Sequence, residues 1–382
     1  MKIVIAPDSF KGNLTSAEAA DCIEKGIKRV FPESVCVKVP VADGGEGMVS
    51  ALLHAKGGRL KTVKVTGPGG RPVRASYGLL NKGKTAVIEM AAASGMTLLS
   101  QRSRNPMTTT SFGTGELIVD AIDSGIQDLI IGLGGSATVD CGAGMAQALG
   151  VRYFDEKGRL IRRRACGGML DRIALIDIDK LHPGLNEAKL TVASDVTNPL
   201  CGKRGAARVY GPQKGADPDM VGILDRNLRH FGRLMRKCMK VDVLHLEGSG
   251  AAGGMGAALA AFTRAEIRNG IDVVLEMSDF NKHLQGADLV ITGEGLVDAQ
   301  TPFGKAPAGV ARIAHGFNIP VIAVGGGLSD DAGVVFKHGI DGLAAAAARD
   351  ISLAEAVKLS RVHLANAAER CMRLIVIGGK IM

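Results

Sequence analysis

Short apolar segments that end at glycine, serine or aspartate recur along the 382-residue chain, and amphipathic stretches follow several of them. The first segment, Lys2–Ala6, is followed by alanines and isoleucines at helical spacing. The predicted helix begins at a Thr15/Glu18 capping box and ends before Pro32. This alternation is typical of an α/β protein with parallel strands. It constrains the fold strongly, because the polar loops of such a protein gather at the carboxyl ends of the strands.

Further strands and a final helix follow from the same kind of pattern. Five segments have strand length: Val35–Val39, Asp128–Leu133, Leu190–Ala193, Asp288–Thr292 and Val321–Val324. Ile340–Ala348 is a further candidate strand, and one helix is expected over Ser352–Arg373. Three more strands are expected, at Val63–Thr66, Pro72–Leu80 and Thr85–Met90. The connections between them are tight and contain glycine, which predicts hairpins.

These patterns predict two α/β domains. The outer one is expected to be Rossmann-like, doubly wound and discontinuous, formed by residues 1–64 and 286–382, with a second α/β domain inserted at residues 65–285. Aromatic residues make up only 3% of the chain and tryptophan is absent, so alanine, valine, isoleucine, leucine and methionine must form the core. The 52 glycines indicate many tight turns.

Charge and cysteine usage limit the function further. A net charge of +9 favours anionic partners without identifying them. Seven scattered cysteines with no C-x-x-C pair argue against a zinc ribbon or a disulfide framework and favour the reducing cytoplasm. The N-terminal apolar run is too short for a signal peptide, and no membrane-spanning segment is expected. The sequence leaves a homo-oligomer open.

Two glycine motifs match nucleotide-binding patterns. Residues Gly78–Thr85 match the phosphate-loop pattern, but the β-like run that follows predicts a hairpin turn instead of the required helix. Residues Gly248–Gly253 match the dinucleotide fingerprint, with Val241–Leu246 as the preceding strand and Glu276 as a ribose-binding acid. This second turn could bind any phosphate, pack a helix closely through small residues, or serve a nicotinamide-dependent hydroxy-acid dehydrogenase.

Five loops that follow expected strands combine acids, hydroxyls, lysines and glycines. They are Asp8–Lys11, Asp43–Gly47, Gly134–Gly142, Ser194–Asn198, and Gly293–Thr301 with Lys305 just beyond. Phosphoryl transfer needs this set, because backbone N–H groups and lysine neutralise phosphates while carboxylates hold Mg²⁺ and orient the attacking hydroxyl. The eight histidines lie outside these loops, and no Ser–His–Asp or Cys–His set is evident.

Two basic clusters raise the question of nucleic-acid binding. Arg159 and Arg162–Arg164 lie in one short stretch, and basic residues recur at helical spacing between Arg226 and Lys240. Few aromatic side chains are available for base stacking, so a solvated basic face is the preferred interpretation and no nucleic-acid partner is expected.

The loops together resemble the bacterial glycerate kinase family that phosphorylates D-glycerate, the type unrelated to actin-like sugar kinases. The resemblance covers essentially the whole chain, and seven ordered blocks carry it: Ala6–Lys11, Ala42–Gly47, Gly134–Thr138, Asp195–Leu200, Gly211–Ala216, Gly250–Gly254, and Ile291–Gly295 with Gln300, Thr301, Gly304 and Lys305. It implies ATP as donor, Mg²⁺, D-glycerate as acceptor and 2-phosphoglycerate as product, in glyoxylate and sugar-acid catabolism. A kinase for a related hydroxy acid is the remaining variant of this interpretation.

Two positions depart from the family pattern. Val139 replaces an asparagine, and Leu296 replaces an arginine after Gly-Glu-Gly. Leucine cannot form the bidentate contact that arginine makes with a carboxylate or phosphate. If that arginine contacts the substrate in relatives, this chain is expected to be a weaker enzyme or to act on a different hydroxy acid.

The loop positions lead to a hypothesis for the site, in which the glycerate hydroxyl attacks the γ-phosphate in the cleft between the domains. The candidate catalytic residues are Asp195, Asp298, Lys11 and Asp8, and the first two are also the candidate metal ligands. The candidate substrate- and phosphate-binding residues are Ser9, Asp43, Gly44, Gly45, Glu46, Gly134, Gly135, Ser136, Thr138, Asn198, Lys214, Gly250, Gly253, Gly254, Glu294, Gln300, Thr301 and Lys305.

Overall fold

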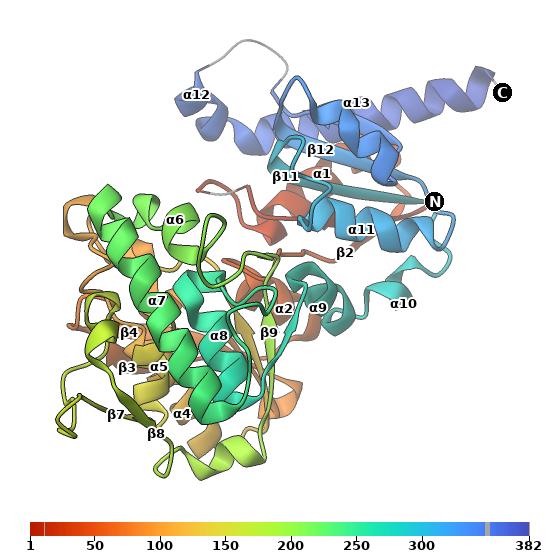
Figure 1. Ribbon diagram of the computed structural model, residues 1–382. Helices are drawn as coiled ribbons and strands as arrows, with labels where there is room; N and C mark the ends of the chain where they lie inside the picture. The colour runs from red at the N-terminus through yellow and green to blue at the C-terminus, as the bar shows by residue number, and fades with distance from the viewer. Residues whose placement is uncertain (11, 348–351, 382) are drawn as a thin grey trace. The chain divides into compact units, whose positions relative to one another are not determined.

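The computed structural model describes residues 1–10, 12–347 and 352–381. The chain divides into two compact units (Figure 1). Unit 1 comprises Met1–Asp43, Ser50–Gly57 and Asn269–Met382, and unit 2 comprises Gly44–Val49 and Gly58–Arg268. The proposed domain boundaries at 64/65 and 285/286 therefore differ from the unit boundaries at 57/58 and 268/269.

Unit 1 is a parallel five-stranded sheet in the order β13-β12-β11-β1-β2. Its strands are β1 (Lys2–Pro7), β2 (Val35–Lys38), β11 (Leu289–Val297), β12 (Val321–Leu328) and β13 (Gly342–Ala345). Helices α1 (Ser16–Lys28) and α13 (Ser360–Ile381) pack together, while α11 (Ala306–His315) packs against β11 and β12. Further helices are α9 (Gly270–Met277), α10 (Phe280–Leu284) and α12 (Leu353–Lys358).

Helix α1 begins as the sequence predicts. Thr15 Oγ1 accepts a hydrogen bond from the Glu18 N–H, and the Glu18 carboxylate accepts one from the Thr15 N–H at 2.9 Å. Ile23 and Ile27 on this helix share a buried cluster with Ile3 and Ile5 of β1. Alternate residues of a strand point to opposite faces, so one face of β1 is covered by α1.

Unit 2 is a mixed six-stranded sheet in the order β10-β9-β6-β5-β4-β3. Its strands are β3 (Arg59–Thr66), β4 (Pro72–Leu80), β5 (Thr85–Glu89), β6 (Asp128–Gly132), β9 (Lys189–Ala193) and β10 (Glu266–Arg268); β7 (Arg152–Phe154) and β8 (Leu175–Asp177) form a separate pair. The pairs β3–β4 and β4–β5 are antiparallel, and the remaining pairs of the large sheet are parallel. The predicted hairpins are confirmed, and Asn81–Gly83 is the turn between β4 and β5, not a phosphate loop.

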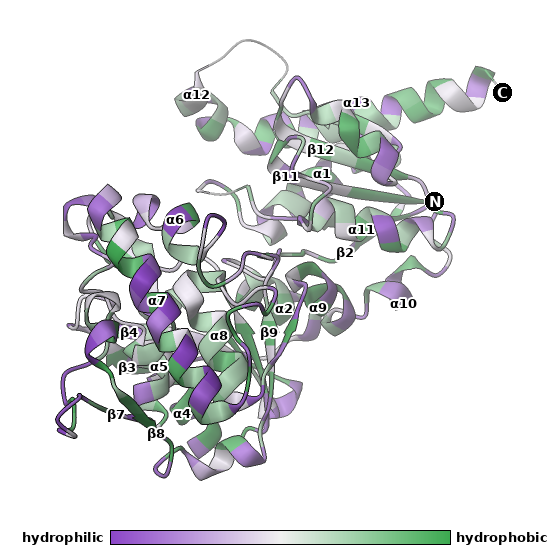
Figure 2. Cartoon of the chain, viewed as in Figure 1, coloured by the Kyte–Doolittle hydropathy of each residue, from purple (hydrophilic) through white to green (hydrophobic). Residues whose placement is uncertain are grey.

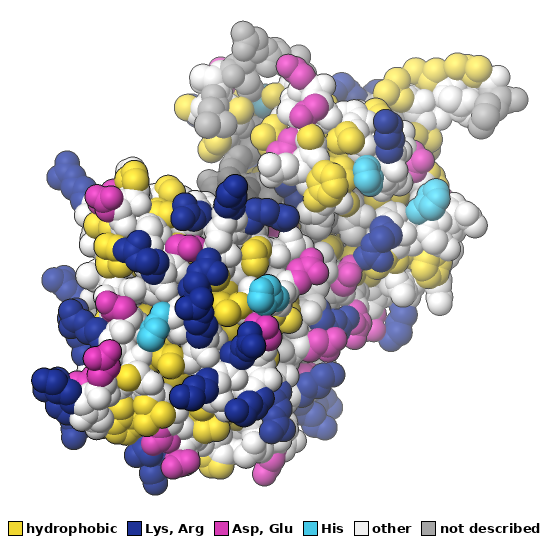
Figure 3. Space-filling view, in the orientation of Figure 1, with side chains coloured by type: hydrophobic (Ala, Val, Ile, Leu, Met, Phe, Trp, Pro, Cys, Tyr) yellow, Lys and Arg dark blue, Asp and Glu magenta, His cyan; other side chains and the backbone are white. Residues whose placement is uncertain are grey.

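The helices of unit 2 differ sharply in polarity (Figure 2). Its helices of eight or more residues that begin and end within it are α4 (Phe112–Asp123), α7 (Pro218–Met239) and α8 (Ala251–Thr263), and the shorter ones include α5 (Ala143–Ala148) and α6 (Ala206–Tyr210). Helix α8 is almost entirely buried, whereas α7 buries Leu224, Leu228, Phe231 and Met235 on one face. Lysine and arginine side chains gather over the outer face of α7 (Figure 3).

Three sequence expectations need correction. Val241–Leu246 is not a strand but a loop and turn that follow α7. The expected helix over Ser352–Arg373 is two helices, α12 and α13, because the chain leaves helical geometry at Leu359. The strand expected over Ile340–Ala348 is confined to β13, and residue 348 lies outside the described residues.

No helix within the described ranges is long and apolar enough to cross a membrane.

Candidate functional site

The loops that follow β6 and β9 lie at the same edge of the unit 2 sheet. These strands are parallel neighbours, with Gly132 of β6 opposite Ala193 of β9. Their carboxyl ends therefore bring together the segment from Gly134 to Asp140 and the segment from Asp195 to Asn198. Asp195 is half-buried in the second segment.

Lys214 is hydrogen-bonded to the loop that begins at Gly134, on the buried side of that loop. Its ammonium group is buried and donates hydrogen bonds to Ser136 Oγ at 2.7 Å and to the Thr138 carbonyl at 2.8 Å. Burial lowers the pKa of Lys214 to about 7, although the nearby Asp140 carboxylate favours the charged form. The predicted phosphate-binding residues Ser136, Thr138 and Lys214 are thus brought together, with Lys214 as the anchor.

Asp140 fixes the end of the same loop. Its fully buried carboxylate accepts hydrogen bonds from Ser111 Oγ at 2.6 Å and from the N–H groups of Ser111, Gly142 and Gly144. Desolvation raises the pKa of Asp140 against the effect of these donors. Sequence reasoning missed Ser111, because its link to Asp140 exists only in the folded chain.

The turn from Gly248 to Gly254 packs directly against this loop. A Cβ on Gly253, whose φ is +71°, would lie 1.9 Å from the Thr138 carbonyl oxygen. The Gly250 N–H donates to the Asn198 carbonyl at 3.0 Å and the Gly254 N–H donates to the Gly250 carbonyl at 3.3 Å. Close backbone packing therefore accounts for these glycines, and two of the predicted phosphate donors already have backbone acceptors.

The structure does not support the interpretation of this turn as a dinucleotide-binding site. The fingerprint needs a strand that leads into the glycine turn, and the segment before Gly248 is not a strand. Glu276, the expected ribose-binding acid, belongs to unit 1, whereas the glycines belong to unit 2.

The Gly44–Gly47 loop approaches the ends of β5 and β6 through contacts that only glycine allows. A Cβ on Gly132 would lie 2.5 Å from the Gly44 carbonyl oxygen, and one on Gly134 would lie 2.6 Å from the Gly45 Cα. Glu89 at the end of β5 accepts hydrogen bonds from the N–H groups of Gly47 and Val49, so it holds this loop in place. The sequence offered no signal for Glu89, whereas Glu46 is exposed beside it.

Asn198 has a structural partner on each side of its amide. Its Nδ2 donates to the Arg204 carbonyl at 2.7 Å, and its Oδ1 accepts from the Tyr210 hydroxyl at 2.8 Å. These bonds fix the loop after β9.

In unit 1, the predicted residues follow three neighbouring strands. Asp8 follows β1, Asp43 follows β2 and Asp298 follows β11, in a sheet where β1 lies between the other two. Asp8 is buried, and one of its carboxylate oxygens accepts the Ser9 N–H at 2.6 Å. Lys11 lies outside the described residues.

The residues from Glu294 to Lys305 form one hydrogen-bonded cluster. The Lys305 ammonium group lies 2.9 Å from Asp298 Oδ1 and 3.4 Å from Glu294 Oε2. The Thr301 hydroxyl donates to Glu294 Oε1 at 2.6 Å, and Asp298 Oδ1 also accepts the Gln300 and Thr301 N–H groups. The structure therefore brings together five predicted residues, Glu294 from β11 and four from the segment between β11 and α11.

The pKa values of the two carboxylates in this cluster are shifted in opposite directions. Desolvation raises the pKa of Glu294 more than Thr301 and Lys305 lower it. Desolvation would also raise the pKa of Asp298, but the Lys305 hydrogen bond and the backbone donors outweigh it and lower that pKa. Asp298 is consequently the more strongly held anion.

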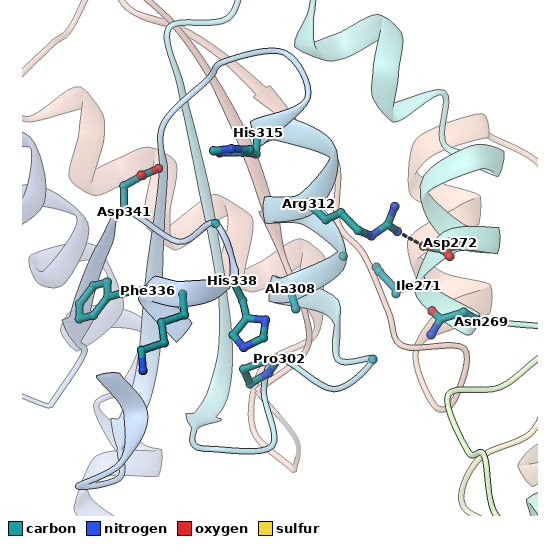
Figure 4. A pocket seen from close by; sticks show the side chains of 14 residues that line it. Asn269, Ile271, Asp272, Pro302, Ala308, Arg312, His315, Phe336, His338 and Asp341 are labelled. Carbon is teal, nitrogen blue, oxygen red and sulfur yellow. Dashed lines mark hydrogen bonds and ion pairs between the residues drawn. The ribbon is translucent and has the colours of Figure 1, made fainter. Parts of the chain in front are cut away.

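A cavity of about 620 Å³ adjoins this loop in unit 1 (Figure 4). Pro302 and Gly304 line one side of it, and α11 and the segment before β13 line others. Arg312 is ion-paired with Asp272 across the edge of the cavity, while the buried Asn269 Oδ1 has no hydrogen-bond partner among the described residues. The cavity has the size of a small-molecule site.

Comparisons with known proteins show which family the chain belongs to. The glycerate kinase family matches residues 3–376. The chain belongs to the glycerate kinase family. The "Glycerate kinase" of Bacillus subtilis (strain 168) is 49% identical over 100% of this chain and 98% of its own length, and the "Glycerate 2-kinase" of Escherichia coli (strain K12) is 48% identical over 99% of both.

A solved structure of another protein has the same fold as this chain. It is the crystal structure of a protein from Salmonella typhimurium LT2, provisionally described as glycerate kinase 2. It superposes with a TM-score of 0.88, is 46% identical, and covers 100% of this chain and 99% of its own. The predicted α/β fold and the predicted kinase class are thereby confirmed.

The two departures from the family pattern occupy different environments. Val139 is completely buried in the core of unit 2, where an asparagine would need hydrogen-bond partners. Leu296 lies at the end of β11 with half of its surface exposed, so an arginine could extend into solvent there.

The acidic side chains of the described residues form no metal-binding cage of their own. No group of three or more histidine, cysteine, aspartate or glutamate side chains in the described part of this glycerate kinase family chain could hold a metal ion. Mg²⁺ in kinases is usually held by one or two carboxylates together with substrate phosphates, so a dedicated protein cage is not required. Asp195 in unit 2 and Asp298 in unit 1 each offer one such carboxylate.

Proposed function

We propose that this glycerate kinase family chain transfers the γ-phosphate of ATP to the 2-hydroxyl of D-glycerate and releases 2-phosphoglycerate and ADP. The choice of the 2-hydroxyl is supported by the relative named glycerate 2-kinase, which is 48% identical over 99% of both chains. In the transfer, the bond between the glycerate oxygen and the γ-phosphorus forms while the bond from that phosphorus to the bridging oxygen of ADP breaks.

Asp195 is proposed to accept the proton of the attacking hydroxyl. The other candidate, Asp298, accepts hydrogen bonds from Lys305 and two backbone N–H groups, and its lowered pKa makes it a weaker base. Asp298 is better suited to position the Lys305 ammonium group, which would neutralise phosphate or carboxylate charge. Lys11 and Asp8 remain candidates for substrate contact in unit 1.

The loop between Gly134 and Asp140 is proposed to bind an anionic group of a substrate. Lys214 from below and Asp140 at its end hold the loop in one conformation, so its donors are arranged before a substrate arrives. The Thr138 hydroxyl is fully buried and has no hydrogen-bond partner in the described ranges.

Mg²⁺ is proposed to bind together with ATP, and the carboxylate of Asp195 or Asp298 would complete its coordination. When bound, it neutralises the charge of the β- and γ-phosphates. The seven free thiols and the use of ATP support a cytoplasmic location as part of this proposal.

Incubation of the purified chain with D-glycerate and Mg·ATP tests the proposal. We expect ADP and 2-phosphoglycerate, identified by ³¹P NMR against standards of both phosphoglycerates, and loss of turnover when EDTA is added. Exclusive formation of 3-phosphoglycerate would contradict the choice of hydroxyl. The absence of any phosphorylated product across a panel of hydroxy acids would refute the kinase activity.

A further inference from the structure

A second cavity, of about 590 Å³, lies in unit 2 beside the basic stretch Arg162–Arg164. Its lining consists of Gly69, Gly70, Thr108, Thr110, Phe112, Gln147, Arg162, Arg163, Arg164 and Cys166. Three arginines and two threonines therefore line one cavity, and no aspartate or glutamate belongs to this lining. Such a concave, basic and acid-free surface attracts anions.

The basic stretch is held in position by one side chain. Gln147 Nε2 donates to the Arg163 carbonyl at 3.2 Å, and Gln147 Oε1 accepts the Ala165 N–H at 2.9 Å. These two bonds flank Arg164 and fix the backbone that presents it. The arginines are consequently placed by the fold and are not carried on a free loop.

Arg164 is also oriented at its far end. Its guanidinium lies over the Phe112 ring at 5.1 Å from the centroid. Phe112 is the first residue of α4, a 12-residue helix with no acidic residue in its first turn, so the positive end of the helix dipole adds to the field of the arginines. The cation, the ring and the helix end belong to the same cavity wall.

The arginines of α7 provide a contrast within the same unit. They form a stripe on the outside of a helix, and Arg229 and Arg236 are ion-paired with Asp225 and Asp242. Arg162 and Arg164 have no ion pair among the described residues and surround a hollow. All three arginines of the Arg162–Arg164 cluster are exposed to solvent, but unlike the arginines of α7 they line one concave surface.

We propose that this cavity binds a small molecule that carries a phosphate group, at a site separate from the catalytic loops. Arginine forks suit a phosphate because two parallel N–H groups match two of its oxygens, and the cavity has the volume of a metabolite site. The Thr110 side of the cavity adjoins Ser111, whose hydroxyl holds Asp140 at the end of the Gly134 loop. A bound phosphate would thus act close to the residues that position that loop.

Isothermal titration calorimetry on the full chain tests this site, with 2-phosphoglycerate and inorganic phosphate as separate probes. We expect the wild-type chain to bind one more equivalent of 2-phosphoglycerate than an R162Q/R164Q variant, with at least about a tenfold loss of affinity at that site for each guanidinium removed. An R226Q/R233Q variant, which removes the same charge from the outer face of α7, is expected to keep the extra equivalent. The Arg164→Lys variant, which keeps the charge but not the fork, is expected to bind with intermediate affinity.

The measured affinities and stoichiometries identify the group that the cavity recognises. Tighter binding of 2-phosphoglycerate than of inorganic phosphate would identify a phosphorylated acid as the ligand, and equal binding would identify free phosphate; both support the site. Equal stoichiometry in the wild-type chain and the R162Q/R164Q variant would overturn it, as would equal loss in the α7 variant. Binding of D-glycerate at this site with the same affinity as 2-phosphoglycerate would also overturn it, because the phosphate would not be recognised. The difference in stoichiometry does not depend on kinase activity.

Discussion

Lys214 donates a hydrogen bond of 2.7 Å to Ser136 Oγ from a position that solvent does not reach. A phosphate-binding lysine normally extends into its site, whereas this ammonium group lies beneath the loop whose residues were predicted to bind phosphate. Lys214 therefore acts on that loop by holding Ser136 and Thr138 in place.

Replacement of Lys214 by methionine is expected to lower kcat/KM by about 100-fold or more, because the Gly134 loop loses its anchor. The stability of the two proteins should also diverge with pH. The folded pKa of about 7 lies below the ordinary value of 10.5, so the unfolded chain binds more protons between these values and the wild-type chain gains stability as the pH rises.

Thermal unfolding at several pH values between 7 and 10 measures this effect. The melting temperature of the wild-type chain minus that of Lys214→Met should increase with pH across this range. A difference that is flat or falls with pH would show that Lys214 is not a buried, easily deprotonated amine.

The two candidate catalytic aspartates are expected to fail in different ways. Asp195→Asn should reduce kcat by about 10²- to 10⁴-fold with little change in KM, because it removes the proposed proton acceptor. Asp298→Asn should reduce kcat/KM mainly through a higher KM, because it releases Lys305. Steady-state kinetics with D-glycerate distinguish the two, and near-normal turnover in both variants would reject the assignment.

Asp140→Asn is expected to destabilise the chain by about 2 to 3 kcal/mol, since an amide NH₂ would face groups that donate to the carboxylate. Urea unfolding monitored by circular dichroism measures the loss. Asp217→Asn is the matched control, because Asp217 caps α7 at the surface and asparagine caps equally well. Equal effects of the two substitutions would contradict the buried role of Asp140.

Gly253→Ala is expected to cost about 3 kcal/mol of stability, because the new Cβ would overlap the Thr138 carbonyl in a left-handed backbone conformation. Gly222→Ala within α7 meets only the end of the Arg226 side chain at 3.7 Å, so a gain of up to about 1 kcal/mol is expected. Parallel urea titrations compare the two alanines. A mild effect at Gly253 would mean that the turn is free to shift, as a phosphate-binding turn without close packing would be.

Leu296→Arg restores the residue that the family pattern has at this position. If the arginine contacts the substrate in relatives, the variant should lower the KM for D-glycerate or ATP by about tenfold or more. Leu328→Arg is a matched control, because Leu328 is also an exposed leucine, at the end of the adjacent strand β12. Unchanged KM values in Leu296→Arg, or equal changes in both variants, would show that position 296 does not contact substrate.

Much of the fold could be predicted because its signals are local. The capping box of Thr15 and Glu18, the hairpin turn at Asn81–Gly83 and the polar loops after β6, β9 and β11 all depend on residues that are close in sequence. The strand predicted over Val241–Leu246 was wrong for the opposite reason. Its apolar residues Val243 and Leu244 pack on the core without strand pairing, and periodicity alone cannot separate these two cases.

The candidate site was predicted as a set of loops but not as a set of contacts. Glu89 and Ser111 carried no recognisable signal, yet one holds the Gly44–Gly47 loop and the other holds Asp140. Their partners are 42 and 29 residues away along the chain, and only the folded sheet brings them within hydrogen-bond distance.

The sequence by itself determined the class of chemistry, because phosphoryl transfer requires residue types that are visible as glycines, acids and lysines after strands. The tertiary structure decided what individual residues do. It placed the Lys214 ammonium group beneath a loop, paired Asp298 with Lys305, and turned the Gly250–Gly254 motif into a packing surface. Burial and the position of partners set the pKa and the availability of each group, and both depend on chain segments that are distant in sequence.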